Sequence, residues 1–449
     1  MKTLIKCSRV ITMDSRRRIF ADGSLIVSGN TIERVLTQAE TAQLGSFEGD
    51  VIDARSLVAI PGFIQTHIHL CQTLFRGLAD DLELLDWLKL RIMPYEYAHN
   101  AKSMYASAMA GIAELLRSGT TTIMDMGSVH HEEEVIRAVT ETGLRAFVGK
   151  AMMDMNTLYP PLRESTKDSV ASTLNLARYT HGLADGRVRY AVAPRFVLSC
   201  SDELLAEAYA MTKDFPGMLF HTHAAENRHE LEAVRERCKM DNVEFFDELN
   251  ILHANTCLAH CIWLNDREFD LMKERNAKVL HCPSSNLKLG SGVARIPLMQ
   301  TTGITVSLGA DGAPCNNTLN MFEEMRLAAL MQKPLHGPTA MNARSVFEMA
   351  TIGGATTLNI FNDVGSLEAG KRADVVLLNL NKSWNPYEPQ NDDDLYSSIV
   401  YSCSSENVES VMVDGRWLYR SGQYMMMDEP KALHDAREEL RLLLQRVHA

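Results

Sequence analysis

Two histidines separated by one residue end an apolar run near the start of the sequence. Residues 61–69 read PGFIQTHIH, so His67 and His69 close this run. Alternate side chains of a β-strand share one face, and both imidazoles are therefore expected to point the same way. Neutral imidazole is a suitable ligand for zinc or ferrous iron. A pair alone is equally compatible with two unrelated polar residues at the end of a strand.

Three further apolar runs end in side chains that could bind a metal or transfer a proton. The first ends in His221 and His223, the second in His260 and the third in Asp311. Three or four such ligands leave one coordination position open for water, as a metal-dependent hydrolase requires. Spacing alone does not choose between His221 and His223, because these two side chains share a face.

Two more residues have types and positions that suit a hydrolase. Glu226 lies three residues after His223, where the strand passes into its loop, close enough to the predicted metal to act as acid and base. Its alternative is a solvated glutamate at a helix start. A bridging lysine or glutamate would indicate two metals, but the fourth predicted strand ends in Arg195, which cannot bind a metal, so one metal is favoured. The guanidinium of Arg195 is suited to donate hydrogen bonds to an acceptor atom of the substrate. The alternative interpretation is a structural ion pair.

The pattern of the chain indicates which elements position these side chains. From Val58 to about Asn359, apolar strand-like runs alternate with amphipathic helical segments such as 101–118, 202–213 and 266–275. This alternation predicts repeated βα units and a parallel sheet. We therefore expect an α/β fold in which residues 59–359 form a metal-dependent (β/α)₈ TIM-like barrel, whose active site lies at the carboxyl ends of the strands.

Both chain ends show shorter alternating stretches that are broken by turn residues. We expect residues 1–58 and 360–425 to form one small β-sandwich domain, with the barrel inserted between its two parts. Residues 426–449 carry many charges and are predicted to form a C-terminal helix.

Composition excludes several classes of protein. The chain has 449 residues, a formal net charge of -12 and 46% hydrophobic residues, which argues for a globular protein and against a nucleic-acid-binding surface. No uncharged apolar run approaches the length of a membrane span, so no membrane partner is expected. Nine cysteines, an odd number scattered through apolar stretches, favour the reduced cytoplasm over a disulfide framework.

The motifs taken together resemble the amidohydrolase superfamily over essentially the whole chain. Within it they resemble the branch of guanine deaminases, S-adenosylhomocysteine or 5'-deoxyadenosine deaminases and triazine hydrolases. The motifs that carry the resemblance are PGFIQTHIH at 61–69, HAAE at 223–226, LAHC at 258–261, HCPSSNLKLG at 281–290, LGADGAPCNN at 308–317 and GSLEAGKRAD at 365–374.

The resemblance implies a metal site and a reaction. It implies one divalent metal per chain, zinc or alternatively ferrous iron, held by His67, His69, His223 and Asp311. It places Glu226, His260 and Asp311 as catalytic residues: Asp311 and His260 deprotonate a water made acidic by the metal, and Glu226 protonates the ring nitrogen beside the carbon that is attacked. The implied partner is a small amino-heterocycle, and the family's habit implies a homo-oligomer.

The residues expected to bind the substrate mix features of several relatives. Trp87 and Glu96, within WLKLRIMPYE at 87–96, and the stretch that contains Asn316 resemble nucleoside deaminases. Gln72 and Arg195 instead resemble the guanine deaminases, where the matching Gln and Arg read the purine.

Two further basic residues concern the amino-acid tail that S-adenosylhomocysteine carries and simpler nucleosides lack. Lys150 stands where S-adenosylhomocysteine deaminases carry one of two arginines that grip a carboxylate, and Arg163 matches the other. We therefore predict hydrolytic deamination of a 5'-deoxyadenosine or adenosine-type nucleoside, with methylthioadenosine and S-adenosylhomocysteine as variants. Guanine is the second hypothesis and an s-triazine amino- or chlorohydrolase the third. A catalytically inactive metal-binding scaffold is the hypothesis from a different class.

Overall fold

The computed structural model describes residues 2–388 and 390–447, and these fall into two compact units. Unit 1 comprises Met1–Ile64, Ala113–Thr122 and Asn320–Met427. Unit 2 comprises Gln65–Ile112, Ile123–Leu319 and Asp428–Ala449. The domain boundaries expected from the sequence remain predictions.

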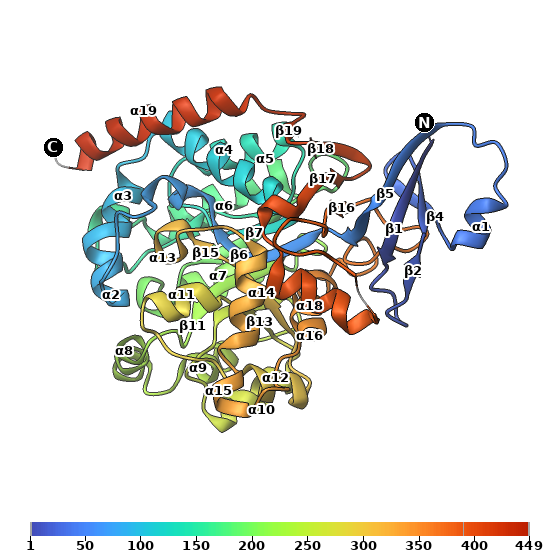
Figure 1. The fold of residues 1–449 in the computed structure, drawn as a ribbon. Helices are drawn as coiled ribbons and strands as arrows, with labels where there is room; N and C mark the ends of the chain where they lie inside the picture. Colours follow the sequence, from blue (N-terminus) through green and yellow to red (C-terminus); the bar gives the residue numbers. More distant parts are fainter. Residues whose placement is uncertain (1, 389, 448–449) are drawn as a thin grey trace. The chain divides into compact units, whose positions relative to one another are not determined.

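Parallel strands close into a barrel (Figure 1). In chain order they are β6 (Phe63–His69), β7 (Thr120–Asp125), β8 (Arg145–Val148), β9 (Ala151–Met152), β10 (Val188–Pro194), β11 (Leu219–Ala224), β12 (Thr256–His260), β13 (Lys278–His281), β14 (Val306–Leu308) and β15 (Asp311–Gly312). Both β8 and β9 pair with β10, while β14 pairs with β13 and the nearby β15 pairs with β6. The strand order thus returns to its start. This sheet confirms the predicted (β/α)₈ barrel.

Amphipathic helices alternate with these strands, as the sequence pattern predicts. They include α4 (Ala101–Arg117), α5 (Glu132–Thr142), α6 (Thr166–Thr180), α7 (Asp202–Met211), α8 (Arg228–Cys238), α9 (Asn242–Glu248), α10 (Asp266–Glu274), α12 (Ile296–Thr302), α14 (Met321–Leu330) and α16 (Ala343–Glu348). Local sequence fixes where several of them begin. Asn227 and Glu230 form a capping box that starts α8, in which Asn227 accepts the His229 N–H of the first turn and Glu230 accepts the N–H of Asn227.

Both chain ends contribute to a second, mixed sheet in unit 1 (blue and red strands in Figure 1). Its strands are β1 (Lys2–Ile11), β2 (Ile19–Ala21), β3 (Ser24–Ser28), β4 (Thr31–Leu36), β5 (Asp50–Pro61), β16 (Val375–Leu378), β17 (Val408–Val413), β18 (Arg416–Arg420) and β19 (Gln423–Tyr424). β5 joins the two ends, because it pairs in parallel with β1 and antiparallel with β16. The sheet expected from both ends is confirmed, and its interior is apolar.

The end of the chain returns to unit 2 as the helix α19 (Glu429–Val447). Its Ala436 and Leu443 are buried in one apolar cluster with Phe75 and Tyr95. Arg446 Nε also donates a hydrogen bond to the Ala98 carbonyl at 2.7 Å. Among residues 2–388 and 390–447, no helix is both long enough and apolar enough to span a membrane.

Candidate metal centre and active site

Four side chains converge at the carboxyl ends of β6 and β11 and at the start of β15, just after β14. One possible ligand atom each from His67, His69, His223 and Asp311 lies within 4.8 Å of all the others. The sequence separates these residues by up to 244 positions, yet the closed barrel brings the ends of their strands together. The predicted ligand set therefore has a common centre.

The hydrogen bonds of two histidines fix which ring nitrogen carries the proton. Nδ1 of His69 lies 2.7 Å from the Met126 carbonyl oxygen, and Nδ1 of His223 lies 2.7 Å from the Arg195 carbonyl oxygen. A carbonyl oxygen only accepts, so each ring donates from Nδ1 and, when neutral, leaves a lone pair on Nε2. Burial lowers the pKa of His223 well below its ordinary value, which keeps this ring neutral.

The spacing around Asp311 fits a cation. Its Oδ1 lies 3.3 Å from His67 Nε2 and 3.2 Å from His69 Nε2. A carboxylate oxygen and an imidazole lone pair repel each other at that distance, and a positive ion among them converts the repulsion into attraction. His67 Nε2 is also buried without a hydrogen-bond partner in the described part of the chain. Three imidazole nitrogens and one carboxylate oxygen are a suitable set for zinc or ferrous iron.

His221, which sequence spacing could not separate from His223, has a different position. Its Nε2 lies 2.7 Å from Nδ1 of His67, the ring nitrogen of that candidate ligand that is not directed at Asp311. When His67 presents a lone pair on Nε2, its Nδ1 carries the proton and donates it to His221. Burial lowers the pKa of His67 to about 4, partly offset by Asp311. His221 thus orients His67.

A proton donor stands beside this centre. Glu226 Oε2 lies 3.4 Å from His260 Nε2, and the Glu226 side chain is buried. Its burial, together with the nearby charges of Asp311 and Glu230, raises the pKa of Glu226 well above its ordinary value. The carboxyl group therefore retains its proton at a pH where an exposed glutamate has lost it.

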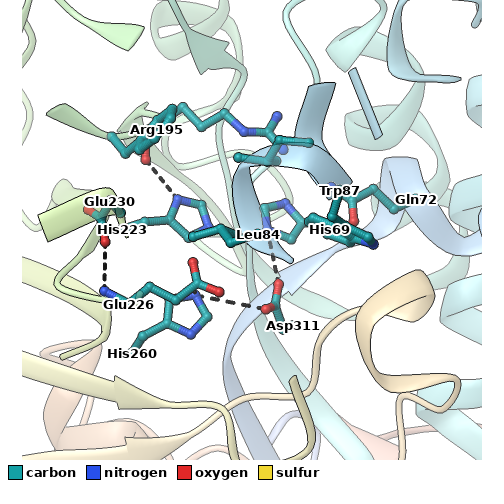
Figure 2. A pocket seen from close by; sticks show the side chains of 12 residues that line it. His69, Gln72, Leu84, Trp87, Arg195, His223, Glu226, Glu230, His260 and Asp311 are labelled. Atoms are coloured by element: carbon teal, nitrogen blue, oxygen red, sulfur yellow. Dashed lines mark hydrogen bonds and ion pairs between the residues drawn. The ribbon is translucent and has the colours of Figure 1, made fainter. Parts of the chain in front are cut away.

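The other oxygen of Asp311 faces His260. Oδ2 lies 3.9 Å from His260 Nε2, and the close view of the site shows Asp311 between His69 and His260 (Figure 2). Nδ1 of His260 lies 2.8 Å from Oδ1 of Asn286, which leaves Nε2 directed at the two carboxyl groups. Asp311, His260 and Glu226 can therefore pass protons among themselves.

The backbone around Asp311 is constrained in a way that only a few residues tolerate. Asp311 and His260 have φ values of 63° and 71°, a left-handed conformation that costs a non-glycine residue about 1–3 kcal/mol. Gly309 comes so close to β6 that an added Cβ would lie 2.5 Å from the His67 carbonyl oxygen. Small residues beside Asp311 therefore allow its strand to approach β6.

These groups border a small, partly open cavity in unit 2. Its volume is ≈ 20 Å³, room for about one water molecule. The residues that line it are His69, Gln72, Leu84, Trp87, Leu88, Arg195, Phe196, His223, Glu226, Glu230, His260 and Asp311. Of the predicted substrate contacts, Gln72, Trp87 and Arg195 are thus in its wall.

Glu96 joins two of these residues from behind. Gln72 Nε2 donates to Glu96 Oε1 at 2.8 Å, and Arg195 forms an ion pair with Glu96 Oε2 at 2.7 Å. All three side chains are buried. Glu96 does not itself line the cavity, so in this conformation it holds Gln72 and Arg195 in place.

The remaining predicted contacts lie elsewhere. Lys150 is buried in an ion pair with Glu164 at 2.5 Å and is not part of the cavity wall. Arg163 is exposed. Asn316 ends the short helix α13 (Ala313–Asn316), where its Nδ2 donates to the Ala310 carbonyl at 2.8 Å, one residue before Asp311.

Sequence reasoning gave no role to Glu230 or Asn286. Glu230 Oε2 accepts the Glu226 N–H at 2.8 Å, and its charge faces the Glu226 carboxyl group from within α8. The capping pattern from Asn227 to Glu230 was a visible signal for the position of Glu230. Nothing local marks Asn286 as the partner of His260, because 26 residues separate them.

Comparison with known proteins agrees with this architecture. The profile of the amidohydrolase family matches residues 58–418. The 5'-deoxyadenosine deaminase of Methanothermobacter thermautotrophicus is 40% identical over 416 residues, 91% of this chain and 91% of that protein. The 5-methylthioadenosine/S-adenosylhomocysteine deaminase of Thermococcus sibiricus is 36% identical over 93% of each chain. A crystal structure of an adenosine deaminase from Xanthomonas campestris with bound zinc is 26% identical, with a TM-score of 0.91 over 99% of this chain and 98% of that one.

The chain therefore belongs to the amidohydrolase family. As the sequence motifs predicted, it is a metal-dependent hydrolase that acts on C–N bonds.

Proposed function

We propose that this amidohydrolase removes the amino group from an amino-purine nucleoside, preferring 5'-deoxyadenosine or adenosine, and releases ammonia. The observation that carries the proposal is the buried carboxyl group of Glu226, which keeps its proton and stands 3.4 Å from His260 at the edge of the metal site. Replacing an amino group on an aromatic ring requires such a donor, because the ring nitrogen must be protonated as the carbon is attacked.

The residues of the site divide the work as follows. His67, His69, His223 and Asp311 hold one divalent ion, which we take to be zinc; when bound, it makes water acidic enough to react near neutral pH. Asp311 Oδ2 and His260 accept the proton of the attacking water. Glu226 gives its proton to the ring nitrogen and then carries a proton to the departing amino group.

The relatives and the placement of charge both support a nucleoside with an uncharged 5' end. Curated relatives at 40% and 36% identity are named for 5'-deoxyadenosine and for methylthioadenosine or S-adenosylhomocysteine. A homocysteine tail ends in a carboxylate that needs a cationic partner. Lys150 is already paired with Glu164 and the guanidinium of Arg195 with Glu96, so of the two predicted tail contacts the exposed Arg163 remains. We therefore rank the tail-less nucleosides first.

Guanine is the second candidate because of one observation in the cavity wall. Gln72 Oε1 is buried without a hydrogen-bond partner within the described residues, and Arg195 lies in the same wall. This amide oxygen could accept from the 2-amino group of guanine, which adenosine lacks. Trp87 Nε1, also buried without a partner in the described ranges, could donate to either purine.

The test is turnover of the purified, zinc-loaded enzyme on a panel of substrates. The panel contains 5'-deoxyadenosine, adenosine, methylthioadenosine, S-adenosylhomocysteine, guanine and ammeline, with ammonia release and the ultraviolet spectrum as readouts. We expect kcat/KM to be highest for 5'-deoxyadenosine or adenosine, and about tenfold or more lower for S-adenosylhomocysteine, because Lys150 is held by Glu164 and an ion pair with the exposed Arg163 is worth little in water. Ammonia release from guanine alone would overturn the ranking. A cytoplasmic location and a homo-oligomeric state stay predictions from the sequence.

A further inference from the structure

A buried thiol lies beside the candidate active site and has no part in the proposed reaction. Cys282 directly follows β13, at the edge of the barrel where β12 ends in His260. Its Sγ, one ring nitrogen of His260 and one carboxylate oxygen of Asp311 lie within 4.8 Å of one another. All three residues are buried. This second group of potential ligands shares Asp311 with the first group and includes none of the three histidines that complete it.

Asp311 is oriented so that its two oxygens face different groups. Oδ1 is the atom near His67 and His69, at 3.3 and 3.2 Å, whereas Oδ2 faces His260 Nε2 at 3.9 Å. The same orientation is visible in Figure 2, where the carboxylate lies between His69 and His260. One carboxylate can therefore contribute an oxygen to each of two neighbouring ions.

His260 supplies a second, independent sign of an unfilled site. Its Nδ1 is held by Asn286 Oδ1 at 2.8 Å, which directs Nε2 toward Asp311. Nε2 is fully buried and has no hydrogen-bond partner among residues 2–388 and 390–447, although Glu226 Oε2 lies 3.4 Å away. Buried polar atoms in native proteins nearly always have a partner, so this nitrogen faces a ligand, which is water in the proposed reaction and a metal ion when the second site is filled.

We propose that His260, Cys282 and Asp311 form a second metal site, which takes a thiophilic divalent cation such as Cd²⁺ or excess Zn²⁺ and inhibits the enzyme. One nitrogen, one sulfur and one oxygen donor, completed by water, make a tetrahedral site of the kind these ions favour. The thiolate selects Cd²⁺ and Zn²⁺ over Mg²⁺ and Mn²⁺, which prefer oxygen. Binding releases the thiol proton to solvent. Inhibition follows because the ion occupies His260 and Oδ2 of Asp311, and this step rests on the proposed function.

The binding test uses the full-length enzyme loaded with one equivalent of Zn²⁺ and titrated with Cd²⁺. Bound cadmium, released zinc and the ultraviolet absorbance of a thiolate–cadmium bond are measured in the same samples. We expect a second ion to bind with this absorbance and without loss of the first, because the first group contains no sulfur. Mg²⁺ in place of Cd²⁺ gives no second ion.

Cysteine variants identify the sulfur. Cys282→Ser should abolish the thiolate–cadmium absorbance and weaken binding of the second ion by about tenfold or more. Cys282→Ala serves as the second variant if the serine form does not fold. The matched control is Cys257→Ser, a buried thiol three residues before His260 on β12, which should leave the absorbance intact. An absorbance that is missing from the parent, persists in Cys282→Ser, or disappears only in Cys315→Ser overturns the proposed site.

Activity measurements distinguish failure of the second metal site from failure of the proposed deaminase function. Excess Zn²⁺ should inhibit the parent, and Cys282→Ser should need about tenfold or more zinc for half-inhibition, with each enzyme compared with its own uninhibited rate. Second-ion binding without turnover of any substrate on the panel would retain the site and reject the deaminase function. Turnover without a second thiolate-bound ion would retain the function and reject the site.

Discussion

The sheet built from both chain ends and the mouth of the barrel bury their side chains equally deeply, but they bury different atoms. In the sheet, Ile5, Leu25 and Val375 are 0% exposed and belong to one apolar cluster. At the barrel mouth, His67 and His260 are also 0% exposed, yet Nε2 of each lacks a hydrogen-bond partner within the described residues. Equal burial thus serves stability in one region and ligand binding in the other. Variants in the two regions should have separable effects.

The largest effect is expected from Glu226→Gln at the barrel mouth. Glutamine cannot give up a proton, so kcat should fall about 10²–10⁴-fold. Metal content, measured by elemental analysis, should stay at the parent level, because Glu226 is outside the four-residue ligand group. Glu232→Gln, an exposed position on α8, the helix that follows Glu226, is the control and should change neither quantity. Turnover near the parent rate in Glu226→Gln would remove its assigned role.

The next effect concerns the orientation of a metal ligand. His221→Phe removes the ring that lies 2.7 Å from His67 Nδ1, and the affinity for zinc should fall about 10–100-fold. Competition with a chelator measures this affinity. His253→Gln is the control, since His253 Nε2 bonds the Asn250 carbonyl and has no contact with the metal group. Equal zinc affinity in His221→Phe and the parent would mean that His67 needs no support from behind.

A smaller effect is expected on the pH dependence of turnover. The raised pKa of Glu226 keeps the carboxyl group protonated, so kcat/KM should decline as pH rises through that pKa. Glu230→Gln removes one of the negative charges that raise it, and the alkaline limb should therefore move to lower pH. The measurement is a pH profile of kcat/KM for both enzymes. A limb that stays in place or moves to higher pH would assign it to another group.

The smallest effect is expected in the sheet of unit 1. Ile5→Val deletes one buried methylene, and the free energy of unfolding should fall by about 0.5–1.5 kcal/mol. Urea denaturation measures this change, while metal content and KM should equal those of the parent. A variant that loses metal would show that the two regions are not independent.

Regular elements of the barrel were predictable because their sequence patterns are local. The runs expected to end in His223 and His260 are the strands β11 and β12, and the helical segment expected at 266–275 ends one residue beyond α10. The side chains that end these strands were predictable for the same reason, because strand periodicity and strand ends are written in neighbouring residues. The helix α18 (Asp392–Ser402) was missed, because residues 360–425 were assigned to the β-sandwich domain and no helix was expected among them.

The pairing of side chains across the barrel was not predictable from local pattern. Lys150 was expected to contact the substrate, and nothing in the local sequence indicated that Glu164, 14 residues away, is its ion-pair partner. Likewise, only the folded chain places Met126 behind His69 and Asn286 behind His260. Such contacts depend on how separate loops approach one another in space, and no period in the sequence encodes that approach.

The small size of the cavity has a consequence for the speed of catalysis. A space of ≈ 20 Å³ admits a water but not a purine, so a substrate can enter only when the wall moves. The helix α2 (Leu84–Trp87) supplies part of that wall. Two partly exposed ion pairs hold the chain just before it: Asp80 with Lys288 at 2.5 Å and Glu83 with His229 at 3.1 Å. If release of these ion pairs limits substrate entry, dissolved salt, which screens exposed charges, should raise kcat/KM.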